Sequence, residues 1–151
     1  MTADDDPLRT VRKAADQVVT ATVALQNDTE LALSVEAGAT YAVSAWICYA
    51  AASNTPDLRT NYTYPTGSTF KRSEYGPPSA STTVADVVDV GMATTGDNGR
   101  GAGTAERSMW VQGDLVVGPN AGTFRFVFAQ VTSSADAVTV KAGSRLTLQK
   151  L

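Results

Sequence analysis

A period-two alternation of side chains is the feature of this sequence that most limits its fold. Residues 31–36, 40–51, 57–64, 108–117 and 123–131 all show it. Successive side chains of a β-strand point to opposite faces, whereas an amphipathic helix repeats about every 3.6 residues. Apart from a weak stretch at 11–19, no segment longer than about ten residues carries a helical apolar stripe. The sequence therefore predicts an all-β chain.

Turn residues separate the alternating segments at short intervals. Gly38, Pro56, Pro65, Gly122 and Gly143 lie between them. About eight to ten short strands at such a spacing are typical of a β-sandwich or jelly roll. Since 151 residues suffice for one well-packed core, we predict a single antiparallel, jelly-roll-like β-sandwich over residues 15–151.

The segment 40–51 is the strongest predicted strand, and it is apolar on both faces. Its odd positions carry Tyr, Val, Ala, Ile and Tyr, and its even positions include Trp46 and Cys48. A strand without a polar face is expected to be covered on both sides. This predicts self-association, most simply as a homotrimer. As the single cysteine, Cys48 is interpreted as a small buried hydrophobic residue.

Residues 1–14 differ in character from the rest of the chain. An acidic run, Asp4 to Asp6, is followed by Pro7 and a basic cluster, and large apolar side chains are few. Such a tail is disordered by itself unless a partner orders it, and such a charge block is usually solvated. We predict an extended N-terminal arm that docks on a neighbouring subunit or particle, with Leu8, Arg9, Arg12 and Lys13 as its docking residues.

Two segments are rich in turn-forming residues. Residues 65–82 contain Pro, Gly and Ser at high density, which predicts a long loop that forms an interface or binds a ligand. Residues 94–104 are glycine-rich and predict a flexible hairpin tip. The candidate side chains in or beside the long loop are Tyr64, Phe70, Lys71, Arg72 and Tyr75.

The chain offers little recognisable catalytic chemistry. It contains no histidine, which removes the commonest general base and the usual transition-metal ligand. Asp86 and Asp89 are three residues apart on a predicted strand, so their carboxylates point to opposite faces. We therefore predict no catalytic residue, no metal site and no cofactor.

Charge and hydropathy exclude two further classes. The net charge is −3, whereas nucleic-acid binding needs clustered Lys and Arg. No apolar run approaches the ~20 residues that span a bilayer, and the start of the chain lacks the basic-then-apolar pattern of a signal peptide. We expect no nucleic-acid partner, no membrane partner and synthesis in a cytoplasm without secretion.

Two parts of the chain, residues 15–49 and 113–151, carry a pattern of turns and strand starts. Its residues are Ala15 to Thr20, Leu25 to Leu31, Val35 to Tyr41, Ala121 to Phe124, Phe128 to Gln130 and Ala142 to Leu146. This pattern resembles structural proteins of phages that infect actinobacteria, among them minor tail proteins and other virion surface components. The resemblance implies a β-sandwich in an assembled virion, made in the cytoplasm of a host bacterium, with the major capsid protein or tail proteins as partners. It carries over no active site.

Three functional hypotheses follow. The first is a capsid decoration protein that binds the outside of the particle as an oligomer, since the chain is short and has no fibrous segment. Many weak contacts repeated over the lattice would then act through avidity. The second is a minor tail protein of the same virion. The third, from another class, is a carbohydrate-binding module, which requires an exposed row of Tyr64, Tyr75 and a Trp.

Overall fold

The computed structural model describes residues 7–80, 88–89 and 98–151. All secondary structure in these residues is β, and every strand pair is antiparallel. The strands are β1 (Leu8–Arg12), β2 (Gln17–Val19), β3 (Gln26–Val35), β4 (Thr40–Ala51), β5 (Leu58–Thr63), β6 (Thr69–Gly76), β7 (Val88–Asp89), β8 (Asn98–Arg100), β9 (Arg107–Val116), β10 (Gly122–Gln130), β11 (Val138–Val140) and β12 (Arg145–Lys150).

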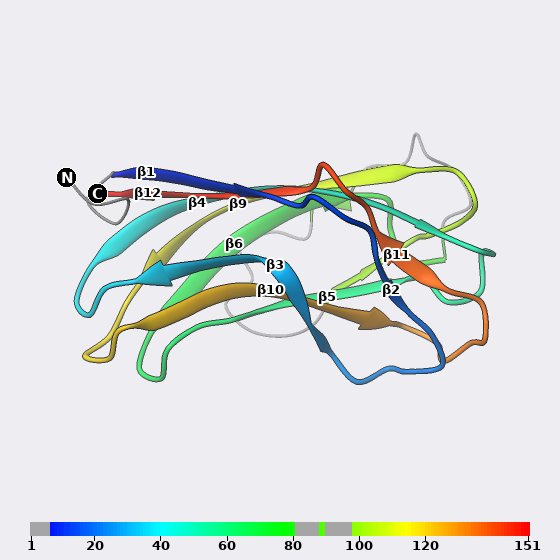
Figure 1. The fold of residues 1–151 in the computed structure, drawn as a ribbon, viewed down its shortest axis with the longest axis horizontal. Helices are drawn as coiled ribbons and strands as arrows, with labels where there is room; N and C mark the ends of the chain where they lie inside the picture. Colours follow the sequence, from blue (N-terminus) through cyan, green and yellow to red (C-terminus); the bar gives the residue numbers. More distant parts are fainter. Residues whose placement is uncertain (1–6, 81–87, 90–97) are drawn as a thin grey trace.

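The strands form two sheets that face each other (Figure 1). The large sheet has the order β1-β12-β4-β9-β6-β7, and β11 and β2 extend it beside β4. The small sheet has the order β3-β10-β5-β8. The predicted all-β class and antiparallel sandwich are confirmed.

The core lies between the sheets and is rich in aromatic rings. Phe124, on β10, stacks on Tyr62 at 5.3 Å between ring centroids and meets the edge of Phe70 at 4.9 Å. On β4, the odd-numbered residues from Tyr41 to Ala51 are buried, and the even-numbered residues are only half-buried. Within the described chain, one face of this strand is therefore covered and the other is not.

The first described residues belong to the large sheet. Strand β1 pairs with β12 over its whole length, from Leu8 opposite Gln149 to Arg12 opposite Arg145. The backbone N–H of Lys13 then donates to the carbonyl of Ser144 at 2.8 Å. Residues 8–13 are thus ordered by their own chain, where the sequence predicted an arm awaiting a partner. Residues 1–6 lie outside the described part.

The predicted long loop at 65–82 is wrong over residues 69–76, which form β6. This strand pairs with β9 from Thr69 opposite Val116 to Tyr75 opposite Trp110. Its alternation was hidden because two of the inward positions carry Arg72 and Glu74, which are buried and neutralise each other. Residues 81 and 82 lie outside the described chain.

The predicted flexible tip at 94–104 is also wrong where the structure describes it. Asn98–Arg100 forms β8 beside β5, and residues 101–103 are buried. The carboxylate of Asp57 accepts a hydrogen bond from the N–H of Ala102 at 2.9 Å. A side chain at Gly103 would collide with the amide of Asn54, so the glycine there permits close packing. Residues 94–97 lie outside the described chain.

Candidate functional site

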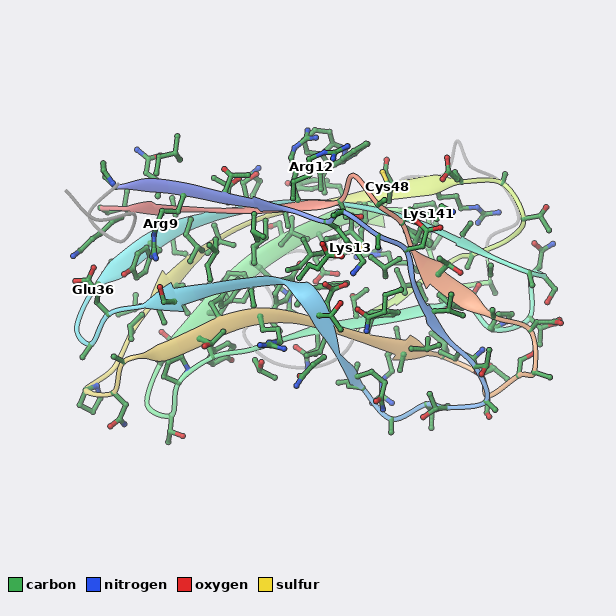
Figure 2. All side chains as sticks on the ribbon, viewed as in Figure 1. Arg9, Arg12, Lys13, Glu36, Cys48 and Lys141 are labelled. Carbon is green, nitrogen blue, oxygen red and sulfur yellow. The ribbon has the colours of Figure 1, made fainter. Side chains whose placement is uncertain are left out.

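Lys13, predicted as a docking residue, is fully buried between the layers, whereas Arg12 points outward (Figure 2). The Lys13 ammonium lies 3.0 Å from a carboxylate oxygen of Asp28 on β3. The same carboxylate accepts hydrogen bonds from the N–H groups of Glu30 and Leu31 at 2.9 and 2.8 Å. This ion pair joins the start of the chain to the small sheet and is not available to a partner.

The other three predicted docking residues divide between the two sides of β1. Arg9 reaches across to β3 and donates to the hydroxyl and carbonyl of Ser34 at 2.9 and 2.7 Å. Leu8 is 53% exposed, and Arg12 is exposed on the outer face of the large sheet. Leu8 and Arg12 are therefore the members of this set that a partner can reach.

The predicted ligand residues around β6 divide in the same way. Phe70 and Arg72 are buried, and Tyr64 is half-buried against the core. Lys71 and Tyr75 are exposed on the outer face. A row made of Tyr64, Tyr75 and a Trp does not exist, because Tyr64 packs against the core, with its ring 6.3 Å from that of Phe70.

The buried charges of β6 form a network between the sheets. The carboxylate of Glu74 accepts from Arg72 Nε at 2.7 Å and lies 3.3 Å from a terminal nitrogen of Arg100 on β8. The hydroxyl of Thr60 approaches the same carboxylate at 3.5 Å. Burial raises the pKa of the neighbouring Tyr62 well above its ordinary value, and the negative charge of Glu74 adds to the effect. The network holds the two sheets together at this end.

One register row of the large sheet brings cationic and aromatic side chains together on the outer face. Register partners across five neighbouring strands are Arg12, Arg145, Trp46, Trp110 and Tyr75. The Arg145 guanidinium lies 4.6 Å from the Trp46 ring, and the two indoles are 6.2 Å apart. Trp110 is 46% exposed and Tyr75 38%. With strands about 4.8 Å apart, the row is ~19 Å long.

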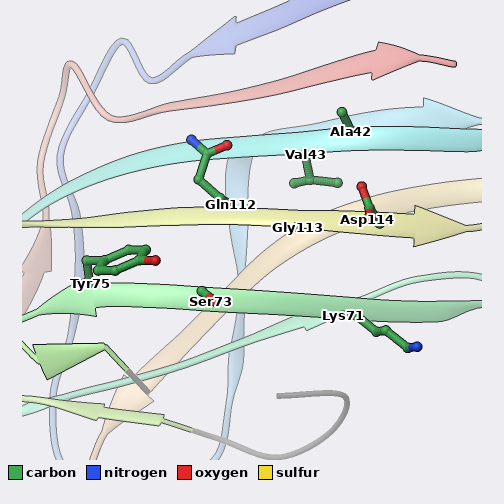
Figure 3. A pocket seen from close by; sticks show the side chains of 8 residues that line it. All are labelled: Ala42, Val43, Lys71, Ser73, Tyr75, Gln112, Gly113 and Asp114. Carbon is green, nitrogen blue, oxygen red and sulfur yellow. The ribbon is translucent and has the colours of Figure 1, made fainter. Parts of the chain in front are cut away.

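Beside this row the outer face is hollowed. A shallow depression of about 320 Å³ is lined by Ala42, Val43, Lys71, Ser73, Tyr75, Gln112, Gly113 and Asp114. Figure 3 shows the Tyr75 ring at one end, Lys71 and Asp114 at the other, and Gln112 and Ser73 between them. Small residues on β4 and β6 create the hollow because their side chains reach little above the sheet. We call it the Tyr75 depression.

Sequence reasoning missed Trp110, Gln112 and Asp114 as neighbours of Lys71 and Tyr75. Their own strand was predicted, but the pairing of β9 with β6 was not, because β6 was read as a loop. The alternation Lys71, Ser73, Tyr75 against Phe70, Arg72, Glu74 is the signal that would have revealed it.

In the part of the chain that the structure describes, the remaining reactive groups do not gather into a site. Cys48 is half-buried on the outer face, not in the core as predicted, and burial raises the pKa of its thiol. Burial also raises the pKa of Tyr49, whose hydroxyl donates to the carbonyl of Gly101 at 3.0 Å. Among the described residues, no three Cys, Asp or Glu side chains are grouped as a metal site. The same residues include no helix with the length and hydropathy of a membrane span.

Comparison with known proteins gives only distant structural matches. No family model matches the chain, and no curated protein is similar to it. A structure of the Gt strain of infectious bursal disease virus matches at 13% identity and a TM-score of 0.25, covering 99% of this chain and 43% of that chain. The VP2 subviral particle of the same virus matches at 10% identity, with the same TM-score and coverage. This chain thus spans less than half the length of those proteins, and the likeness is too distant to carry an argument.

Proposed function

We propose that this chain is a non-catalytic structural protein of a virus particle, present in many copies. The sequence resemblance over residues 15–49 and 113–151 supports the proposal. So does the use of charge in the structure, since the buried Lys13, Arg72 and Glu74 all form ion pairs within the chain. These groups stabilise the sandwich and leave its surfaces as the means of action.

The surface that we assign to particle binding is the edge formed by β1 and β2, which we call the N-terminal edge. The observation that supports this assignment is the exposure of large apolar side chains, since Leu8 is 53% exposed and Val18 is 55% exposed. Arg12 lies between them and is exposed as well. Exposed apolar side chains with a nearby cation suit a protein partner.

Binding to purified particles tests this assignment. The particles come from the virus that encodes the chain and lack this protein. We expect Leu8→Glu combined with Arg12→Glu to weaken co-sedimentation with the particles at least tenfold. Val116→Glu is the matched control, because Val116 is 48% exposed on the same sheet but far from the edge. Equal binding by the edge variant and wild type would contradict the assignment.

For the place on the virion, we propose a capsid decoration protein that binds the outer surface as a homotrimer, with the major capsid protein as partner. The half-covered outer face of β4 near its C-terminal end, around Cys48 and Ala50, is the surface that self-association would bury. Neither residue lines the Tyr75 depression. Sedimentation of the isolated protein at three times the chain mass is the expected result. A minor tail protein of the same virion is the alternative.

Immunogold electron microscopy on whole particles separates these locations. Dense label over the head supports decoration, and label confined to the tail supports the tail alternative. Particles without label, intact or opened, would refute the virion proposal itself.

A further inference from the structure

We infer that the Tyr75 depression is a binding site for a neutral oligosaccharide. The depression lies on the outer face of β4, β9 and β6. These strands are interior to the large sheet, away from the N-terminal edge. The inference does not depend on the virion proposal, because it concerns a different part of the molecule.

The polar groups of the depression are available for hydrogen bonding. Within the described chain, Lys71 and Asp114 face each other in register, and the side chain of neither has a hydrogen-bond or ion-pair partner. Gln112 donates from its amide nitrogen to the hydroxyl of Ser44 at 3.0 Å, which fixes the side chain. A donor, an acceptor and an oriented amide thus lie within one hollow. Such an array fits a ligand that carries many hydroxyl groups.

The aromatic groups supply the other half of saccharide recognition. Tyr75 closes one end of the depression, and Trp110 lies directly opposite Tyr75 on the neighbouring strand. Both rings are partly exposed although both are large and apolar. The face of an aromatic ring is negative and attracts the weakly positive C–H groups of a pyranose ring. A sugar can therefore pack its apolar side on the rings while its hydroxyls reach the polar groups.

The charges favour a neutral ligand. The ammonium of Lys71 and the carboxylate of Asp114 have opposite signs and lie opposite each other. An anion would be repelled by Asp114 and a cation by Lys71. Sugar hydroxyls, in contrast, can donate to the Asp114 carboxylate and accept from the Lys71 ammonium. A peptide added as a strand is disfavoured here, since β9 is paired on both sides and offers no free backbone edge.

The dimensions favour an oligosaccharide over a single sugar. Lys71 and Tyr75 are four residues apart on β6, about 13 Å at ~3.3 Å per residue. The depression is shallow and is not an enclosed cavity. A flat chain of equatorially substituted pyranoses could lie across it without a closed pocket.

Titration of the isolated protein with cellohexaose, chitohexaose and mannohexaose tests the inference. Tryptophan fluorescence reports on the exposed Trp110, and calorimetry gives the affinity. We expect at least one of the three sugars to bind with a sub-millimolar Kd. Failure of all three to bind the wild-type protein would overturn the inference.

Variants show whether binding occurs at the depression. Trp110→Ala and Tyr75→Ser should each weaken binding about tenfold, and Asp114→Asn should weaken it by a smaller factor. Val116→Ala is the matched control on the same strand and face, and it should bind as wild type does. Each variant is checked for an unchanged unfolding midpoint. If one of the two ring variants fails this check, the other still tests the inference. Full binding by a folded ring variant, or an equal loss in the control, would overturn the inference.

Particle binding distinguishes this inference from the proposed function. The Trp110→Ala and Tyr75→Ser variants should co-sediment with particles as wild type does, because the N-terminal edge is intact. The edge variant should in turn keep its affinity for the sugar. Loss of both activities in a ring variant would show that the two sites are one surface and would overturn the separate assignment.

Discussion

The two sides of β6 contrast in a way that reverses ordinary expectation. Its inward residues include Arg72 and Glu74, which are 1% and 0% exposed, whereas its outward residues include Tyr75, which is 38% exposed. The strand buries charges and exposes an aromatic ring. A similar division occurs at Arg12 and Lys13, neighbours in sequence with opposite environments.

The difference shows that the available partner, more than the polarity of a side chain, decides what is buried here. Arg72 and Lys13 are each inside with a carboxylate within 3.0 Å, at Glu74 and Asp28 respectively. Unpaired buried charges are strongly unfavourable, whereas paired and hydrogen-bonded ones are tolerated. The outward Tyr75 and Trp110 take no part in these buried ion pairs and are partly exposed. We therefore assign them to binding.

The largest expected effect comes from breaking the inner network of β6. Glu74→Gln would leave Arg72 and Arg100 buried with no carboxylate between them. Loss of one partner from a buried ion pair costs about 3–5 kcal/mol. Urea unfolding should show this loss of stability, and the outward Lys71→Met should change it by less than about 0.5 kcal/mol. Equal effects at the two positions would show that the contrast between the faces is not energetic.

A slightly smaller effect is expected at the start of the chain. Lys13→Met would leave the Asp28 carboxylate buried without a cation, although two backbone N–H groups still donate to it. We expect a loss of about 3 kcal/mol, near the low end for a broken buried pair. Arg12→Met, one residue away and exposed, should be close to neutral. Thermal unfolding of both variants measures the difference, and a neutral Lys13→Met would show that the segment behaves as a free arm.

A third variant tests how tightly β9 packs on β6. Gly113 points inward, and a methyl group there would lie 2.8 Å from the Phe70 ring and still closer to the backbone of Lys71. Because a backbone cannot move aside cheaply, Gly113→Ala should destabilise the protein by about 1–3 kcal/mol. Asp114→Ala, the outward neighbour, is the control for denaturant unfolding. An unchanged midpoint in Gly113→Ala would mean that the two strands can separate without cost.

The smallest effect is expected at an exposed ion pair. Asp16 accepts hydrogen bonds from Lys141 Nζ at 2.5 Å and from the N–H of Ala142 at 2.8 Å. Both hydrogen bonds lower the pKa of Asp16 from its ordinary value of 3.8, and the bond from Lys141 has the larger effect. The ionised form is thus favoured by folding, so its contribution is present above about pH 4 and is lost as the pH falls through the lowered pKa.

Asp16→Asn should therefore be slightly less stable than wild type at pH 7, because the pair is partly exposed and screened by solvent. The difference should shrink below pH 4 and disappear at lower pH. Unfolding midpoints across this range measure it, and a difference independent of pH would exclude the ionised carboxylate as its cause.

Part of the fold and of the site can be predicted from local sequence. The strands around residues 40–51, 108–117 and 123–131 follow from their alternation, and the structure has them as β4, β9 and β10. Lys71 and Tyr75 were predicted as site residues and lie on the exposed face. The strand that carries them, β6, was not predicted. Arg72 and Glu74 occupy positions where an alternating strand usually has apolar residues, so the segment resembled a polar loop.

The sequence by itself determined that the chain is an all-β sandwich, because the period of its side chains is a local property that any strand pairing preserves. Only the tertiary structure decided which charges are inside and which strand lies beside which. It thereby decided that Tyr75 and Asp114 line one hollow and that Trp110 lies opposite Tyr75. Residues 75 and 110 are far apart along the chain, and their proximity depends on the register between β6 and β9. In that register Gly113 of β9 lies close against Phe70 and the backbone of Lys71 on β6. A slip of one residue would turn the outward side chains of β6 inward, so the register depends on tertiary packing.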